Sequence, residues 1–376
     1  MKHNFREHHL FQILSQYESQ SLPLDLFLRN YFRQHTAVGS KDRKFIAEAV
    51  YGMIRWRGLL DHLCDKPFTW EKRLERYVGF DPLTLQADQT IPQHVRVSFP
   101  RALFDLLCQS LGEEKAIAFC LASNTAAPTT VRVNTLKCSR EALLQKWGDQ
   151  VSVAPTEHSA WGITFKQKVN FFALPEFKEG CFEVQDEASQ LVANLLPVQP
   201  GNLILDYCAG AGGKALAIAP KMQHKGQLYL HDIRHHALLE AKKRLKRAGV
   251  QNAQLLPFDA EHKHALKHKM DSVMIDAPCS GTGTYRRNPD MKWKFSTDSL
   301  ANLVLEQQQI FAEGLAYLKS GGHILYATCS VLPQENERQA AFFEQKYSLE
   351  RVAPSFESMP TQGGMDGFYG VVFRKS

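Results

Sequence analysis

The chain has 376 residues, of which 44% are hydrophobic and 22% are charged. This balance is ordinary for globular proteins and excludes a disordered, collagen-like or disulfide-stapled chain. Lysine and arginine outnumber aspartate and glutamate by 45 to 39, and the net charge of +6 is compatible with a nucleic-acid partner without requiring one. No apolar run approaches the ~20 residues that span a bilayer, and none of the 8 cysteines forms a C-x-x-C pair. We therefore expect a cytosolic monomer with free thiols and no membrane segment.

The first third of the sequence has helical periodicity. Apolar residues recur at three- and four-residue steps between Ile46 and Ile54 and again over residues 101–122. Between them, residues 79–100 are polar and carry three prolines, which is typical of a loop. The sequence predicts an all-α region over residues 1–123 with a linker at about 79–100.

Two α/β regions follow. TTVRVNTL (residues 129–136) alternates like a strand, a short helix is expected at 139–147, and 161–172 resembles a strand pair, so residues 124–180 predict a small α+β unit. Beyond a helix expected at 181–196, the segments NLILDY, QLYLHD, AQLLPFDA, DSVMIDAP and HILYATCS alternate with helical stretches. This rhythm predicts a parallel, doubly wound sheet within residues 181–376, with FYGVVFRKS as a final, antiparallel edge strand.

A glycine-rich loop follows the first strand of this region. It comprises Cys208, Ala209, Gly210, Ala211, Gly212, Gly213 and Lys214. Glycines between a strand and a helix let the backbone approach a ligand, and the helix start supplies N–H donors. The spacing is neither the dinucleotide G-x-G-x-x-G nor a Walker loop, and a tight turn without a ligand is the alternative interpretation.

Three carboxylates follow the next strands. Asp232, Asp259 and Asp276 end the second, third and fourth predicted strands. Each alone is as well explained by a helix N-cap, but together they face the crevice where open α/β sheets bind ligands. An acid at the position of Asp232 accepts ribose hydroxyls, and Asp259 would reach an adenine amino group. The sequence offers no set of residues suited to binding a pyrophosphate. The expected cofactor therefore has adenine and ribose but no phosphate, and S-adenosylmethionine fits this description.

Two cysteines lie beyond strand ends at the same crevice, Cys279 in DAPCSGTG and Cys329 in ATCS. Either alone is explained as a small buried residue; together, beside a methyl donor, they suggest covalent catalysis. Carbon 5 of a pyrimidine is a poor nucleophile, and a thiolate that adds to carbon 6 makes an enamine that takes the methyl group. A base must then remove the proton from carbon 5.

CAGAGGK, DAPCSGTG and ATCS, in this order, resemble the RNA (cytosine-5)-methyltransferases of the RsmB/Sun type. The resemblance covers about residues 124–376 and includes VRVNTLK and FEVQDEASQL. It implies a class I, Rossmann-like S-adenosylmethionine-dependent domain over 181–376 and an RNA-recognition-like subdomain over 124–180. Residues 1 to about 75 look like the NusB-like RNA-binding domain of these enzymes.

The resemblance also implies roles for individual residues. Cys329 would be the nucleophile and Cys279 would resolve the adduct, while Asp276 would hydrogen-bond the cytosine and Lys214 would orient it. The loop 208–214, with the three carboxylates named above, would hold the cofactor. One departure is visible: where the family commonly has Ala-Pro-Gly-Gly, this chain has Gly-Ala-Gly-Gly, so the loop is more flexible in the unfolded chain.

Basic residues mark candidate RNA contacts. YRRNPDMKWK (285–294) mixes cations with aromatic rings, which suits phosphate binding and base stacking. Its candidates are Arg286, Arg287, Lys292 and Trp293; the alternative is a solvated loop with a core tryptophan. In the N-terminal region the candidate phosphate contacts are Arg43, Lys44, Arg55 and Arg57, some of which could be internal ion-pair partners. The basic helix at 240–247 is expected to be a solvated face.

No metal is expected, because lysines surround His262, His264 and His268. The sequence thus predicts transfer of a methyl group from S-adenosylmethionine to carbon 5 of a cytosine in ribosomal RNA. The alternatives are the same reaction on transfer RNA, or a non-catalytic RNA-binding assembly factor that kept the fold.

Overall fold

The computed structural model describes residues 4–20, 22–148, 150–167, 169–256 and 265–376. The chain divides into two compact units, each discontinuous in sequence. Unit 1 comprises residues 1–126 and 284–296, and unit 2 comprises residues 127–283 and 297–376. Among the described residues, no helix is both long enough and apolar enough to cross a membrane.

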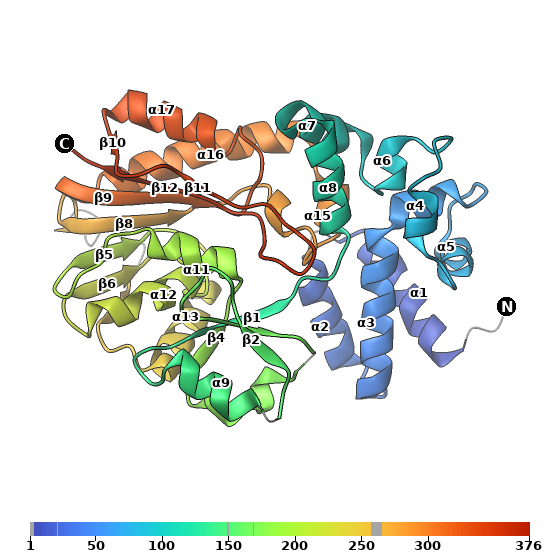
Figure 1. Cartoon of the computed structure of the whole chain (residues 1–376), viewed down its shortest axis with the longest axis horizontal. Helices are drawn as coiled ribbons and strands as arrows, with labels where there is room; N and C mark the ends of the chain where they lie inside the picture. Colours follow the sequence, from blue (N-terminus) through green and yellow to red (C-terminus); the bar gives the residue numbers. More distant parts are fainter. Residues whose placement is uncertain (1–3, 21, 149, 168, 257–264) are drawn as a thin grey trace. The chain divides into compact units, whose positions relative to one another are not determined.

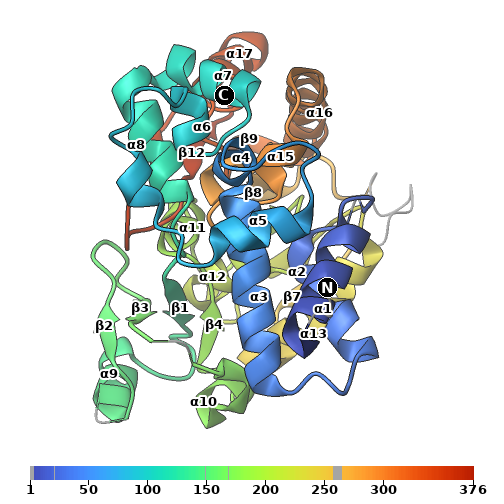
Figure 2. The same cartoon turned by 90° about the vertical axis from the view of Figure 1, so that its right-hand side faces the viewer.

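Unit 1 is helical, as the periodicity predicts. On α3, Ile46, Val50 and Met53 are fully buried at steps of four and three residues, which makes one apolar stripe. This stripe packs against α1, and Figure 2 shows α1, α2 and α3 side by side. The elements of unit 1 before residue 127 are α1 (Phe5–Tyr17), α2 (Leu24–Gln34), α3 (Ser40–Arg55), α4 (Arg57–His62), α5 (Trp70–Tyr77), η1 (Pro82–Leu85), α6 (Gln93–Arg96), α7 (Arg101–Leu111) and α8 (Glu113–Ser123).

The segment at 79–100 differs from the expected linker. It contains η1 and α6, and Ile91, Val97 and Phe99 are buried in it. Pro82 and Pro92 stand at the start of these short helices, where a missing N–H costs nothing. The prolines therefore begin helical turns in a folded part of unit 1.

The most unexpected part of unit 1 is residues 284–296, which follow η3 (Thr282–Thr284) and include α15 (Met291–Lys294). The Tyr17 hydroxyl donates to Asp290 at 2.6 Å, and the Trp293 indole N–H donates to the Ile54 carbonyl at 2.8 Å. The predicted catalytic region is therefore interrupted, because this segment completes the core of the helical unit.

Unit 2 contains a small antiparallel sheet with the order β2-β3-β1-β4, and Figure 2 shows its strands in this order. Its elements are β1 (Thr129–Val133), α9 (Arg140–Gly148), β2 (Val153–Pro155), β3 (Gly162–Phe165), η2 (Phe171–Ala173), α10 (Pro175–Lys178) and β4 (Phe182–Val184). The helix expected at 181–196 and the strand pair expected at 161–172 are both wrong in detail. β4 pairs with β1 before the helix α11 (Glu187–Asn194) begins, and η2 follows the single strand β3.

The large sheet of unit 2 has eight strands within the described residues, in the order β10-β12-β9-β8-β5-β6-β7, with β11 paired to β12 (Figure 1). Its elements are β5 (Leu203–Asp206), α12 (Gly213–Met222), β6 (Gln227–Leu230), α13 (His235–Ala248), β7 (Ala253–Leu255), β8 (Met270–Asp276), α16 (Thr297–Leu315), β9 (Leu318–Thr328), α17 (Glu337–Tyr347), β10 (Glu350–Arg351), β11 (Phe356–Glu357) and β12 (Tyr369–Arg374).

This topology confirms the predicted doubly wound, Rossmann-like sheet. β7, β6, β5, β8 and β9 run parallel, and the order reverses at β5, which lies between β6 and β8. Ligands bind outside the carboxyl ends of strands at such a switch point. The final strand, β12, is antiparallel to β9 as expected, but it is not the edge strand because it pairs with β10 on its other side.

Helices cover both faces of the large sheet. Ile204 and Leu205 point to opposite faces, since successive side chains of a strand alternate. Ile204 packs with residues of α11, α12 and α13, and Leu205 packs with residues of α16 and α17. With both faces buried, the functional residues of this sheet are left to the loops at the strand ends.

Candidate active site

The glycine loop lies at the switch point, between β5 and α12. Gly210 and Gly212 adopt φ values of +52° and +76°, a left-handed conformation that glycine reaches without strain. Gly212 is the N-cap of α12 and has no side chain that could cap the helix, an arrangement typical of helix starts that bind anionic groups. The loop therefore has the backbone expected of a ligand cradle.

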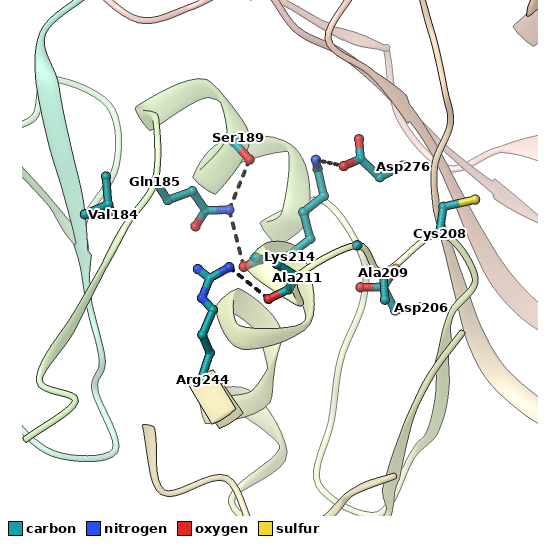
Figure 3. Close-up of a pocket in the computed structure, with 12 residues that line it drawn as sticks. Val184, Gln185, Ser189, Asp206, Cys208, Ala209, Ala211, Lys214, Arg244 and Asp276 are labelled. Carbon is teal, nitrogen blue, oxygen red and sulfur yellow. Dashed lines mark hydrogen bonds and ion pairs between the residues drawn. The ribbon is translucent and has the colours of Figure 1, made fainter. Parts of the chain in front are cut away.

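Two arginine side chains donate hydrogen bonds to carbonyl groups of this loop. Arg244 on α13 donates to the Ala211 carbonyl at 2.8 Å (Figure 3). Arg132 on β1 donates to the Gly213 carbonyl at 3.0 Å. Arg244 also pairs with Glu183 on β4 at 3.0 Å. Sequence reasoning missed both arginines, and the expectation that 240–247 is only a solvated face is wrong for Arg244, whose side chain is 18% exposed.

Asp232 follows β6, and its carboxylate fixes the other edge of the loop. It accepts the Gly210 N–H at 2.7 Å and the Arg234 backbone N–H at 2.8 Å. Although burial opposes ionisation, hydrogen bonds from Arg234 and Gly210 lower the pKa of Asp232. Asp232 is therefore charged near neutral pH. Asp259, the next predicted carboxylate, lies outside the described residues, as do His262 and His264.

Asp276 and Lys214, both predicted site residues, meet at the carboxyl end of β8. The Lys214 ammonium lies 2.5 Å from the Asp276 carboxylate, and the two line one pocket with the glycine loop (Figure 3). A third acid, which sequence reasoning did not single out, is Asp206 at the end of β5. Burial, followed by the charge of Asp276, raises the pKa of Asp206 to about 8. The sequence feature that could have identified Asp206 was its position at the end of a predicted strand, just before the glycine loop.

This pocket has a volume of about 240 Å³, which is below the range typical of a site that encloses a whole cofactor. The walls include the loop residues, Gln185, Ser189 and the acids Asp206 and Asp276. They suit a small zwitterionic group, because acids, amides and backbone N–H donors converge there.

The two predicted cysteines lie together. The sulfur atoms of Cys279 and Cys329 are 3.4 Å apart, and both residues are partly exposed. The hydrogen bond to Cys329, followed by burial, raises the pKa of the Cys279 thiol well above its ordinary value. Cys279 therefore keeps its proton and can donate it to the Cys329 sulfur.

The basic segment at 285–294 buries two of its predicted cations. Arg286 and Lys292 are each only 1% exposed, inside unit 1. The Lys292 Nζ atom donates to the Arg55 carbonyl and to the Asn124 side-chain oxygen, each at 2.7 Å. The RNA contacts expected of these two side chains are therefore corrected to interior positions, since both side chains are buried and the Lys292 nitrogen has its hydrogen-bond partners within the unit.

Other candidate phosphate contacts have mixed positions. Arg55 is largely enclosed and donates to the Arg286 carbonyl at 3.0 Å, so it too serves the interior of unit 1. Arg287 and Trp293 are partly exposed, and Lys44 is exposed on α3. Because these three side chains reach solvent, RNA contacts of Arg287, Trp293 and Lys44 stay predictions.

The doubly wound fold, the glycine loop and the acids at successive strand ends define the class as a Rossmann-like methyltransferase. Residues 193–371 match the family model described as 16S rRNA methyltransferase RsmB/F, and residues 99–171 match an RsmF/B-like ferredoxin-like domain. The ribosomal RNA small subunit methyltransferase B of Vibrio cholerae is 34% identical over 302 residues, covering 77% of this chain and 68% of that protein. The chain belongs to the RsmB/F methyltransferase family.

Two further likenesses agree with this. The ribosomal RNA small subunit methyltransferase B of Proteus mirabilis is 36% identical over 261 residues, covering 67% of this chain and 60% of that protein. A crystal structure of a methyltransferase homolog from Pyrococcus horikoshii has a TM-score of 0.68 at 25% identity, covering 79% of this chain and 100% of that one. The matched region spans 60% to 68% of the length of these two curated relatives.

Proposed function

We propose that this protein transfers a methyl group from S-adenosylmethionine to carbon 5 of a cytosine in RNA, with ribosomal RNA as the first candidate substrate. The observation that carries the proposal is the contact between the Cys279 and Cys329 sulfur atoms at 3.4 Å. They lie beyond the carboxyl ends of the adjacent strands β8 and β9. Cys279 is three residues beyond Asp276, which lines the glycine-loop pocket. A binding protein has no need of two thiols at this place.

The residues of the pocket fit the proposed cofactor. The start of α12 would face its carboxylate, and Asp206 and Asp276 would face its cationic groups. The carboxylate of Asp232 is saturated by Gly210 and Arg234. A ribose diol at Asp232 would therefore displace the Arg234 guanidinium, whose side chain is 60% exposed and free to swing outward. When bound, the cofactor supplies an electrophilic methyl group.

The thiols perform the covalent part of the proposed reaction. The Cys329 thiolate adds to carbon 6 of the cytosine, and the electron pair displaced to carbon 5 takes the methyl group. The Asp276 carboxyl, held by Lys214, hydrogen-bonds the pyrimidine during this step. Once the adduct has formed, the Cys279 thiol loses its proton to solvent, and the resulting thiolate accepts the proton from carbon 5. The C6–S bond then breaks and restores the Cys329 thiolate, so atoms and charge balance.

Parallel assays with labelled S-adenosylmethionine on purified ribosomal RNA and transfer RNA test the proposal. Label in 5-methylcytidine is expected, and the RNA that carries it identifies the substrate class. Cys329→Ala should lose transfer and form no covalent complex with RNA. Cys279→Ala should retain attack and methylation but leave a protein–RNA adduct that survives a denaturing gel. An adduct with Cys329→Ala, and none with Cys279→Ala, would refute the assigned roles.

Absence of transfer to either naked RNA, with cofactor binding intact, would next require assembled ribosomal particles as substrate. If these too stayed unlabelled, the proposed activity would be wrong and the interpretation as a non-catalytic RNA-binding factor would take its place.

A further inference from the structure

A buried carboxylate lies behind the two thiols. Glu335 precedes α17 and has no exposed surface. The oxygen atoms of Glu335 accept four hydrogen bonds, which is the full capacity of an ionised carboxylate. None of the four donors belongs to the glycine loop or to the other walls of the pocket. Cofactor binding therefore does not explain why the Glu335 carboxylate is buried beside the two thiols.

One side of this carboxylate holds the loop that carries Cys279. Oε1 of Glu335 accepts the backbone N–H of Ser280 at 2.8 Å, and Oε2 accepts the Ser280 hydroxyl at 2.5 Å. Gln307 on α16 donates from its side-chain amide both to Oε1 at 3.1 Å and to the Pro278 carbonyl at 3.0 Å. The residues immediately before and after Cys279 are thus both fixed by this pair of side chains.

The other side holds the loop that carries Cys329. Oε2 of Glu335 accepts the hydroxyl of Ser330 at 2.5 Å, and the neighbouring Asn336 side chain donates to the Ser330 carbonyl at 2.8 Å. The Cys329 carbonyl in turn accepts the backbone N–H of Gly283 at 2.9 Å, from the loop that carries Cys279. A single carboxylate therefore joins the residue after each thiol.

We propose that Glu335 is a positioning residue, which sets the separation and orientation of the Cys279 and Cys329 thiols. The proposal deepens the proposed function and rests on it for its kinetic consequence, while the geometric part stands on the contacts alone. Glu335 touches no reacting atom and acts through Ser280 and Ser330. A misplacement of about 1 Å in a catalytic pair can lower a rate about 10²-fold. The hydrogen bonds from Glu335 to both cysteine loops should therefore affect the turnover rate.

The variant Glu335→Gln is the sharpest perturbation because it keeps the size of the side chain. The glutamine amide nitrogen is a donor and would face the donors that now bind the carboxylate. At least one of the hydrogen bonds to the two cysteine loops is therefore lost. We expect kcat to fall about 10- to 100-fold. The Kd for S-adenosylmethionine should stay within about twofold of the wild-type value, because Glu335 is not part of the pocket wall.

Disulfide formation by diamide measures thiol spacing without any turnover. The two thiols lose two protons and two electrons to the reagent, which becomes the hydrazine, and the Cys279–Cys329 peptide is quantified by mass spectrometry. Glu335→Gln should form this bond at least 10-fold more slowly than wild type. The control is Glu344→Gln on α17, which loses only a pairing with Arg351 and should match wild type in both assays.

The outcomes separate the two proposals. Equal disulfide rates for wild type and Glu335→Gln overturn the positioning role, whatever the activity. A slower rate supports it, and a wild type without 5-methylcytidine activity then counts only against the proposed function. If Glu335→Gln does not fold, Ser330→Ala removes one donor alone. It should slow disulfide formation relative to wild type, and an unchanged rate would again overturn the role.

Discussion

Replacing Lys292 by methionine tests the finding that residues 284–296 belong to the core of unit 1. Methionine is apolar and similar in length, so the substitution removes the amine with little change in packing. It leaves the Arg55 carbonyl and the Asn124 side-chain oxygen without the donor that each meets at 2.7 Å. Each buried acceptor without a partner costs about 1–3 kcal/mol. At pH 10 we therefore expect the free energy of unfolding of unit 1 to fall by about 2–5 kcal/mol.

The effect should depend on pH in a definite direction. Burial lowers the pKa of Lys292 well below its ordinary value, so the unfolded state binds the extra proton at intermediate pH. The stability of the wild type therefore falls as pH decreases from about 10.4, by about 1.4 kcal/mol for each pH unit, until the folded-state pKa is reached. Methionine does not titrate. The difference between the two proteins should thus shrink as the pH falls from 10, by up to about 1.4 kcal/mol for each pH unit.

A pulse of thiol labelling at Cys120 during urea titration measures this stability. Cys120 is fully buried in unit 1, so its exposure reports unfolding of that unit alone. Lys294→Met, on the same short helix but paired with Asp290 and 35% exposed, is the control and should give a smaller loss without this pH dependence. A Lys292→Met difference that is constant from pH 7 to pH 10, or below about 0.5 kcal/mol at pH 10, would refute the reasoning.

Two further predictions concern the glycine-loop pocket. Arg244→Ala removes the donor to the Ala211 carbonyl, so the Kd for S-adenosylmethionine measured by calorimetry should rise about 5- to 30-fold. The control variant Lys243→Ala, at an exposed neighbouring position, should leave this Kd unchanged. Equal Kd values for the two variants would contradict a role of Arg244 in holding the loop. Because the pKa of Asp206 is about 8 and a cationic cofactor prefers the ionised carboxylate, cofactor affinity should rise between pH 7 and pH 9 by up to about tenfold relative to Asp206→Asn. Parallel pH profiles of the two proteins would show that Asp206 does not face the cofactor's charge.

Much of the fold and the ligand-facing loop could be predicted from the sequence, because these features are local. A short apolar strand followed by glycines and a helix specifies a strand–loop–helix unit wherever it occurs. The carboxyl ends of parallel strands meet at one edge of the sheet, which is why Lys214, Asp276 and the two cysteines could be placed together. Strand β4 was missed because its three residues are too short to show a period.

The sequence patterns could not predict whether an individual polar side chain is exposed or buried. A lysine in a basic, aromatic segment has the same local pattern whether it meets phosphate or the interior of a protein, and only the positions of Arg55 and Asn124 decide that Lys292 is interior. Likewise, a basic helix looks solvated until Glu183 and the loop carbonyl of Ala211 are found beside Arg244.

The sequence by itself thus determined the order of the strands and helices around the site and the chemistry at the strand ends, since both follow from patterns within a few residues. The tertiary structure decided which polar groups are buried against one another. Glu335 lies 55 residues from Ser280, and Lys292 lies 237 residues from Arg55. Contacts over such separations depend on how the whole chain packs, and the cost of burying an unpartnered polar group is what selects them.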